Sequence, residues 1–573
     1  MPPLPQDGLQ YPSWFALGQC SRCHRGWFAL VRCWGAGENC GVSRNLKNIG
    51  IVSAATVVSR VLGLGRDILV TGVFGTSALA SAFVTAFTLP NLFRRFLGEG
   101  ALTAALVPTL KDEEASEGNV GVFALVNQVG SWLGLVTLLL VTGAMLLLHG
   151  LADSAWLRQV AANADQAARW SEAARLAVIL FPYLVFVCVS AALSAALQTL
   201  GRFLSPALSP IWLNLAMIGM LGGAVWLGEV RVGDARMRWL CAGVLLGGFL
   251  QMVVPALDLM RAGWRPRLVL RLSPQVRAVL LLMGPTVVGS AVYLINMAFS
   301  RILGLSINES AAAVLNLATR LVELPIGVFA IAVSTVVFPL ISGYAASGNW
   351  SKLAEAYHKG MRLVLAVNVP AAVGMMVLAG PIVRVLFERG QFAAADTALV
   401  VPVLLVFAVG LPFFAYVNLM LRAFYAQKDT RTSVRAAMVS FVVNVVLSLA
   451  LMGPLSTMGL ALASNIAIVV QAVILQTRLT ARRAELSSGP WRFDLAKILM
   501  ASGLMALVVK GGEAVLTTIG EGWGPDLVRL ALLLPGGVLV YGIAIWKLRL
   551  TGREELLALL RRRRSIESAN KTS

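Results

Sequence analysis

The chain has 573 residues, of which 58% are hydrophobic and only 13% are charged. A water-soluble domain carries roughly 25% charged residues, so this composition excludes an ordinary soluble enzyme and a disordered chain. Lysine and arginine number 48 against 28 aspartate and glutamate, which gives a formal net charge of +20. In a membrane protein this excess indicates basic cytoplasmic loops, so we expect no nucleic-acid partner.

Long apolar segments recur along the whole chain. A spanning helix needs roughly 20 mostly apolar residues, and this criterion predicts about fourteen spans. They cover residues 48–74, 79–109, 121–149, 173–200, 204–228, 238–260, 276–305, 311–343, 355–380, 397–426, 433–453, 458–480, 495–517 and 525–547. Runs of this length are not barrel strands. The predicted fold class is therefore an all-α polytopic membrane protein.

Positive charge is unevenly divided between the loops. The loops after even-numbered spans are basic and contain Arg261, Arg265, Arg267, Arg271, Lys428, Arg431, Arg435, Arg478, Arg482, Arg483 and Arg492, and the C-terminal tail contains Arg561–Arg564. The loops at 75–78 and 453–457 contain no lysine or arginine. The loop after the second span is acidic around Glu113, but acidic residues weigh little in this rule. The positive-inside rule predicts that both termini are cytoplasmic.

Residues 1–42 differ in composition from the rest and contain four of the six cysteines: Cys20, Cys23, Cys33 and Cys40. Cys20–His24 formally matches a haem-attachment sequence, and the four cysteines could bind zinc. Neither pattern is specific here, because the haem attachment would lie on the wrong side of the membrane and the cysteine spacings are long. We expect a disordered extension, or sequence translated from upstream of the true start.

Residues 43–262 and 263–482 look like two related lobes of six spans each. Asn214 and Asn444 lie at corresponding points of the two lobes, and Pro108 and Pro339 near the ends of corresponding spans. Residues 483–548 then form a C-terminal helix pair, and 549–573 form a basic cytoplasmic tail. Parallel repeats of this kind flank a central site in transporters that work by alternating access. We therefore expect two pseudo-symmetric lobes around a central cavity.

Several charged residues fall inside predicted spans. They are Arg60, Arg66 and Asp67 in the first span, Arg94, Arg95 and Glu99 in the second, and Arg320 and Glu323 in the eighth. Spacings of three and four residues allow Arg320–Glu323 and Arg95–Glu99 to pair along one face of a helix. Such pairing does not account for Arg60, Arg66 and Arg94. The surplus arginines predict a cavity that binds an anion, because arginine matches phosphate with two hydrogen bonds.

The motifs around these charges resemble those of the MurJ (MviN) lipid II flippases, within the multidrug/oligosaccharidyl-lipid/polysaccharide exporter superfamily. The similar stretches are Lys47–Leu110, Phe181–Tyr183, Thr319–Pro325, Leu386–Phe392 and Ala423–Thr430. The resemblance implies alternating-access transport of lipid-linked peptidoglycan precursor to the outer leaflet of the bacterial cytoplasmic membrane. It also implies a groove for the polyprenyl tail between the last two spans, and contact with membrane lipids and with cell-wall synthesis proteins.

The resemblance assigns the binding of the diphosphate-sugar headgroup to Arg60, Arg66, Arg94, Arg320 and Glu99. Arg95, Asp67 and Glu323 then have pairing or structural roles. Many family members have an aspartate where this chain has Ser81, which makes the expected cavity more positive.

Some family members bind sodium through an asparagine and an aspartate one turn apart. Asn444, Ser448 and Ser464 stand at the similar positions here, and the loss of a carboxylate weakens a site for a hard cation. No cofactor is expected. Transport could be coupled to a monovalent cation or to the membrane potential, which acts on a charge with about 2.3 kcal/mol per 100 mV.

Three other functions compete with this prediction. One is a flippase for another polyprenyl-linked polysaccharide precursor, and another is a drug/cation antiporter, although a cationic substrate favours buried carboxylates. The third is a membrane enzyme, which the sequence disfavours. His24, His149 and His358 are far apart, and no phosphate-cradling Gly-Lys-Ser/Thr loop is present.

Overall fold

The computed structural model describes residues 41–98, 101–228, 233–327, 331–487, 489–520 and 522–550. The chain divides into two units, and every site discussed below lies in the unit Val57–Arg553. The described regular structure is helical, as predicted. The N-terminal extension that was expected to be disordered, with its four cysteines, lies almost wholly outside the described residues.

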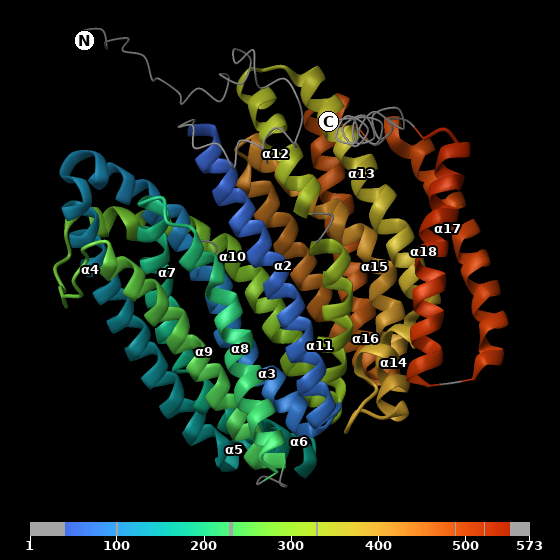
Figure 1. Ribbon diagram of the computed structural model, residues 1–573, viewed down its shortest axis with the longest axis horizontal. Helices are drawn as coiled ribbons and strands as arrows, with labels where there is room; N and C mark the ends of the chain where they lie inside the picture. The colour runs from blue at the N-terminus through green and yellow to red at the C-terminus, as the bar shows by residue number, and fades with distance from the viewer. Residues whose placement is uncertain are drawn as a thin grey trace, which may run out of the picture. The chain divides into compact units, whose positions relative to one another are not determined.

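The first part of the chain forms the helices α2 to α9 (Figure 1). They are α2 (Gly41–Phe74), α3 (Ala78–Gly98), α4 (Ala101–Ala152), α5 (Ala155–Val160), α6 (Ala164–Leu180), α7 (Tyr183–Thr199), α8 (Leu204–Trp226) and α9 (Gly233–Arg261). The predicted fourth span is bent by 42° between α6 and α7. Pro182 lies at this bend, where it removes a backbone N–H from the helical ladder.

The second part contains α10 to α18, with two short 3₁₀ turns. The helices are α10 (Pro274–Ile307), α11 (Ala311–Pro325), α12 (Ile331–Ala346), α13 (Trp350–Val377), α14 (Ala379–Phe387), α15 (Ala394–Ala426), α16 (Thr430–Arg482), α17 (Gly489–Leu516) and α18 (Trp523–Lys547). The turns are η3 (Ala484–Leu486) and η4 (Thr517–Ile519). The predicted eighth span covers α11 and α12, which lie on either side of residues 328–330, outside the described part of the chain.

Two of the long helices are helical hairpins. Gly118 in α4 and Ser456 in α16 have positive φ angles of 64° and 51° and interrupt the helix. A Cβ atom on Gly121 would lie 3.1 Å from the carbonyl oxygen of Glu113, and one on Gly459 would collide with the carbonyl oxygen of Leu451. Eight residues of straight helix span about 12 Å. These contacts therefore require the chain to reverse at each interruption.

Among the described residues, eight helices are long and apolar enough to cross a membrane, or nine if α6 and α7 form one span. Both hairpins are among the eight, so the number of crossings exceeds the number of helices. The chain is a polytopic α-helical membrane protein, and the count of fourteen spans stays a prediction.

Buried side chains gather in clusters centred on the N-terminal and on the C-terminal helices, with α10 contributing to the N-terminal ones. One pair of clusters centres on Leu106 and Tyr183, in α4 and α7, and another on Leu321 and Phe424, in α11 and α15. In Figure 1 the blue-to-green helices accordingly lie beside one another, and the yellow-to-orange helices form a second group. α10 packs against both groups, contacting α3, α4 and α6 on one side and α11 and α16 on the other.

The C-terminal helices α17 and α18 are attached to the second group through a buried ionic cluster. Asp526 accepts hydrogen bonds from Arg384 at 2.5 Å and from Arg529 at 2.6 Å. Arg529, which is 2% exposed, also donates to the carbonyl oxygens of Leu516 and Gly520. Buried charges are tolerated in a protein when they are paired and hydrogen-bonded. This cluster therefore fixes the turn between α17 and α18 to α14.

Candidate functional site

Arg66 is a buried arginine with hydrogen bonds on two sides. It lies on α2 and is 9% exposed. Its guanidinium donates to Oδ1 of Asp67 at 2.6 and 3.0 Å and to Oδ1 of Asn214, on α8, at 3.0 Å. An isolated arginine at the centre of a bilayer costs roughly 2.5–3.5 kcal/mol on insertion scales. The adjacent carboxylate and the Asn214 amide offset that cost.

Asp67 also contacts an arginine of the other group of helices. Its Oδ2 lies 3.6 Å from Nε of Arg320, on α11. Arg320 in turn has Nη1 3.3 Å from Oε2 of Glu323, one turn away. The structure therefore brings Arg66, Asp67, Arg320 and Glu323 together across the two lobes. Asp67, expected only as a pairing residue, is the bridge between them.

This chain of ion pairs differs from the expectation that local pairing would leave Arg66 unbalanced. Two arginines and two carboxylates meet, so this part of the site is neutral overall. Sequence spacing did not assign the carboxylate of Asp67 to Arg66, because neighbouring residues on an ideal helix point about 100° apart. The flexible arginine side chain bends back to reach it.

Arg60, on α2, lies against Gly327, which follows α11. A Cβ atom on Gly327 would collide with the Arg60 guanidinium, so the absence of a side chain at Gly327 makes room for it. Within the described residues, no carboxylate lies within ion-pair distance of Arg60. Asn214 holds the same stretch of α2 by donating to the carbonyl oxygen of Ser59 at 3.1 Å.

The second predicted arginine group cannot be placed at the level of side chains. Arg94 and Arg95 lie in α3, but their side chains are outside the described part of the structure. Glu99 is outside the described residues altogether. The predicted headgroup contacts of Arg94 and Glu99 stay predictions.

Arg301 on α10 is a site residue that the sequence analysis did not select. It is 7% exposed, and its guanidinium lies 3.4 Å from Oδ1 of Asn316. With Arg320 it lines a small polar pocket of about 40 Å³, whose other walls are Thr88, Asn91, Leu92, Met297, Asn316, Thr319 and Glu323. An arginine inside a predicted span was the available signal, and it was the same signal that selected Arg60 and Arg320.

The three candidate sodium ligands do come together. The Oδ1 atom of Asn444 accepts hydrogen bonds from Ser464 at 3.3 Å and Ser448 at 3.5 Å. Its Nδ2 atom donates to Asn296 at 2.7 Å, with Ser300 at 3.5 Å. All five side chains are neutral, and no group of three or more His, Cys, Asp or Glu residues suited to a metal occurs in the described chain.

Two of these contacts occupy equivalent positions in the two halves. Asn214 binds Arg66 on α2, and Asn444 binds Asn296 on α10. Asn444 follows Asn214, and Asn296 follows Arg66, by about 230 residues in each case. Pro339 follows Pro108 by nearly the same interval. In each half an asparagine thus hydrogen-bonds to the first helix of that half, as an internal repeat predicts.

The lobes are joined at the end where α2 and α10 terminate, which we call the distal end. The backbone N–H of Gln391 donates to the carbonyl oxygen of Gly72 at 2.7 Å, and the hydroxyl of Thr76 donates to Asp396. Gly390 has a φ of 61°, and a Cβ atom there would collide with the Gly72 carbonyl. Ser81, fully buried, accepts a hydrogen bond from the backbone of Ala313 at 3.2 Å. These contacts close the distal end.

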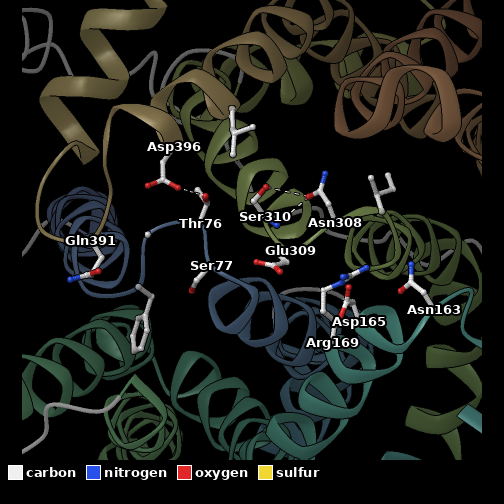
Figure 2. A pocket seen from close by; sticks show the side chains of 14 residues that line it. Thr76, Ser77, Asn163, Asp165, Arg169, Asn308, Glu309, Ser310, Gln391 and Asp396 are labelled. Atoms are coloured by element: carbon white, nitrogen blue, oxygen red, sulfur yellow. Dashed lines mark hydrogen bonds between the residues drawn. The ribbon is translucent and has the colours of Figure 1, made fainter. Parts of the chain in front are cut away.

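A polar pocket of about 700 Å³ surrounds this closure (Figure 2). Asp165 and Arg169 enter it from α6, Asn308 and Glu309 from the α10–α11 turn, and Asp396 from the start of α15. Figure 2 shows Thr76, in the turn that follows α2, directed at Asp396 in the first turn of α15. The pocket thus opens from the distal end and is separate from the arginine network.

The fold is similar to that of solved polytopic helical membrane proteins. A structure titled "Lipid II flippase MurJ, inward closed conformation" has a TM-score of 0.69 at 24% identity and covers 86% of this chain and 97% of its own. An inward-facing multidrug resistance MATE family transporter of the MOP superfamily has a TM-score of 0.57 at 15% identity and covers 74% and 95%.

Sequence comparison is more specific. The family model "Lipid II flippase MurJ" matches residues 70–522. A probable lipid II flippase MurJ of Rhizobium tropici is 35% identical over 493 residues, which is 85% of this chain and 90% of the relative. A second, from Vibrio cholerae, is 32% identical over 473 residues and covers 81% and 88%. The chain belongs to the MurJ lipid II flippase family.

Proposed function

We propose that this protein flips lipid II, the lipid-linked peptidoglycan precursor, from the inner to the outer leaflet of the bacterial cytoplasmic membrane. The observation that carries the proposal is the approach of Arg66 and Arg320 to the same carboxylate, Asp67, at the junction of the lobes. Arginine binds phosphate oxygens with paired, charge-assisted hydrogen bonds. A diphosphate has the charge and the geometry to engage guanidiniums from both lobes.

Asp67 gives this site a means of coupling binding to lobe movement. In the structure its carboxylate holds Arg66 and approaches Arg320. A diphosphate entering the site competes with Asp67 for the same two guanidiniums. Binding of the headgroup would therefore weaken a contact between the lobes, while Arg94 and Glu99 complete the site. The polyprenyl tail stays in lipid, along the groove between α17 and α18.

The distal closure defines which step the structure represents. With Gly72 joined to the loop before α15 and Thr76 to the first turn of α15, the headgroup would not leave through the distal end. Opening of that end, with closure at the opposite end, would release it to the other leaflet. This is alternating access, and it requires no covalent chemistry, so we propose a transporter that is not an enzyme. Cell-wall synthesis proteins would then use the released lipid.

The energy source has two candidates. The cluster around Asn444 is composed of neutral oxygen and amide groups, which bind a monovalent cation more weakly than a site containing a carboxylate. The membrane potential acts directly on a charged headgroup and on the arginines, at about 2.3 kcal/mol per charge per 100 mV. With both termini in the cytoplasm, the basic loops also lie on the side that the positive-inside rule favours.

The function is tested by replacing Arg66 with alanine in a strain depleted of its own flippase. We expect Arg66→Ala to insert into the membrane at normal levels but to fail to restore growth. Arg175→Ala is the matched control, because Arg175 forms an exposed ion pair with Asp153 away from the site. Restoration of growth by Arg66→Ala at the wild-type level would remove the proposed role of the arginine.

A further inference from the structure

The connection between α9 and α10 has a structure of its own. Residues 264–273 contain no helix, and their backbone is bound by side chains of α4. Asn127 accepts from Trp264 Nε1 at 2.9 Å and from the Arg267 N–H at 3.2 Å, and it donates to the Arg265 carbonyl at 3.1 Å. We call this segment the strap.

Further contacts continue along the strap in a regular pattern. Ser131 accepts from the Val269 N–H at 2.9 Å, and Trp132 donates to the carbonyl of Arg271 at 3.4 Å. The backbone groups that face α4 thus belong to residues 265, 267, 269 and 271. In an extended chain the N–H and C=O of alternate residues point to the same side. The side chains of α4 therefore hold the strap much as a neighbouring strand would.

This register sorts the strap's side chains onto two faces. Successive side chains of an extended segment point to opposite faces. Arg265, Arg267 and Arg271 share one face, and Leu268, Leu270 and Leu272 share the other. The leucines are 81%, 45% and 56% exposed, and all three arginines are exposed. The strap is therefore an amphipathic ribbon whose two faces are both free of protein contacts that would cover them.

The surroundings indicate what covers these faces. Beyond Trp132, α4 presents exposed apolar residues such as Leu139 and Leu146, as expected of a lipid-facing helix surface. Trp132 stands at the start of this apolar surface, a position typical of the membrane interface. No aspartate or glutamate occurs between residues 259 and 308. The arginine face thus has no acidic partner from its own part of the chain.

We propose that the strap is a binding site for anionic phospholipid at the membrane surface. The leucine face inserts among the acyl chains, and Arg265, Arg267 and Arg271 bind the headgroup phosphates. Anionic lipids attract basic segments at the interface, and arginine binds phosphate more specifically than a diffuse charge does. The strap links the two lobes along the chain, so lipid bound there anchors the linker to the bilayer surface.

The test is native mass spectrometry of the purified full-length protein in an equimolar mixture of phosphatidylglycerol and phosphatidylcholine. The wild-type protein should retain phosphatidylglycerol preferentially. The triple variant Arg265→Gln, Arg267→Gln, Arg271→Gln should lose this preference. Its affinity for phosphatidylglycerol should fall about fivefold for each arginine removed. The matched control removes the same charge from the exposed residues Arg431, Arg435 and Arg478 by the same substitution.

Three further arms separate the interpretations. Replacement of the three strap arginines by lysine should give a preference between those of the wild type and the glutamine triple, because lysine keeps the charge but not the paired hydrogen bonds. If the glutamine triple does not fold, the single variant Arg267→Gln serves instead. It keeps the backbone bonds to Asn127 and should bind phosphatidylglycerol about fivefold more weakly. Serine at Leu268, Leu270 and Leu272 should weaken both lipids alike. Three results would each overturn the proposal. The strap triple and the control triple could lose the preference for phosphatidylglycerol equally, the strap triple could keep it, or inorganic phosphate could displace the lipid completely.

Discussion

Asp67 shows how one carboxylate can serve two lobes. It is adjacent in sequence to Arg66, yet its second oxygen approaches Arg320, which lies more than 250 residues further along the chain. Removing one partner of a buried ion pair costs about 3–5 kcal/mol, because the other charge is left uncompensated. A diphosphate avoids that penalty by replacing the carboxylate, which is why this network suits a site that exchanges a protein anion for a substrate anion.

Asp429 supports the start of α16 in a way that depends on pH. It accepts a hydrogen bond from the N–H of Thr432 at 3.1 Å and pairs with Arg482 at 2.7 Å. Burial raises the pKa of its carboxyl, but the hydrogen bonds from Thr432 and the charge of Arg482 outweigh burial and hold the pKa below the ordinary 3.8. The ionised carboxylate therefore stabilises the folded state above that pH, and the stabilisation is lost as the pH falls through the lowered pKa.

We accordingly expect Asp429→Ala to be less stable than the wild type by about 1 kcal/mol at neutral pH, since it removes a helix cap. Asp429→Asn keeps a capping side chain and should lose less. Thermal unfolding in detergent at pH 3 to 7 measures both differences. The gap between wild type and Asp429→Ala should narrow at the acidic end of this range. A gap that is constant with pH would contradict the assignment.

At the scale of elements, α8 and α9 pack at backbone distance. A Cβ atom on Gly243 would lie 2.9 Å from Cα of Met217, and one on Gly247 would lie 2.8 Å from Cα of Leu213. Small residues four apart allow helices in a membrane to approach closely, which gains van der Waals contact and interhelical weak bonds. This pair of helices also carries Asn214, so its packing positions the partner of Arg66.

The variant Gly247→Ala should therefore separate α8 from α9 and destabilise the protein by about 1–3 kcal/mol, a typical cost of overpacking. Gly219→Ala is the control, since a Cβ atom there meets nothing within 4 Å. It should be neutral or slightly stabilising, because alanine favours the helix. Thermal unfolding of both purified variants decides this, and equal behaviour of the two alanines would contradict the close packing.

The sequence predicted most of these elements, and it predicted the break at Ser456, which lies in the loop expected at 453–457. The apolar runs located the spans because their length is set by the bilayer. The bend of 42° between α6 and α7 falls inside one predicted span, 173–200, and was not predicted, because an apolar run indicates the length of a span and not its direction. Similarly, the spans identified Arg66 and Arg320, whereas their meeting through Asp67 depends on how α2 and α11 are rotated when packed.

At the scale of the whole transporting unit, the distal closure is a contact between the two halves. It consists of the backbone bond from Gln391 to Gly72 and the side-chain bond from Thr76 to Asp396. Each is a single polar contact. Such a closure can form and open repeatedly, as alternating access requires.

A disulfide placed across this closure should stop transport. In a background with the native cysteines replaced by serine, Thr76→Cys with Asp396→Cys should cross-link under oxidation, abolish lipid II transport and recover on reduction. The control pair, Asp153→Cys with Arg175→Cys, lies within one lobe and should cross-link without effect. Normal transport by the cross-linked Thr76–Asp396 variant would show that this end does not open.

The most direct test of the central claim is a reconstituted measurement of lipid II reaching the opposite leaflet of vesicles that contain only the purified protein. The wild type and Arg175→Ala should transport at equal rates. Arg66→Ala should be at least about tenfold slower, since the loss of one charge-assisted contact is worth roughly 1.5–3 kcal/mol. Equal rates for all three proteins would contradict the assignment of the arginine network as the substrate site.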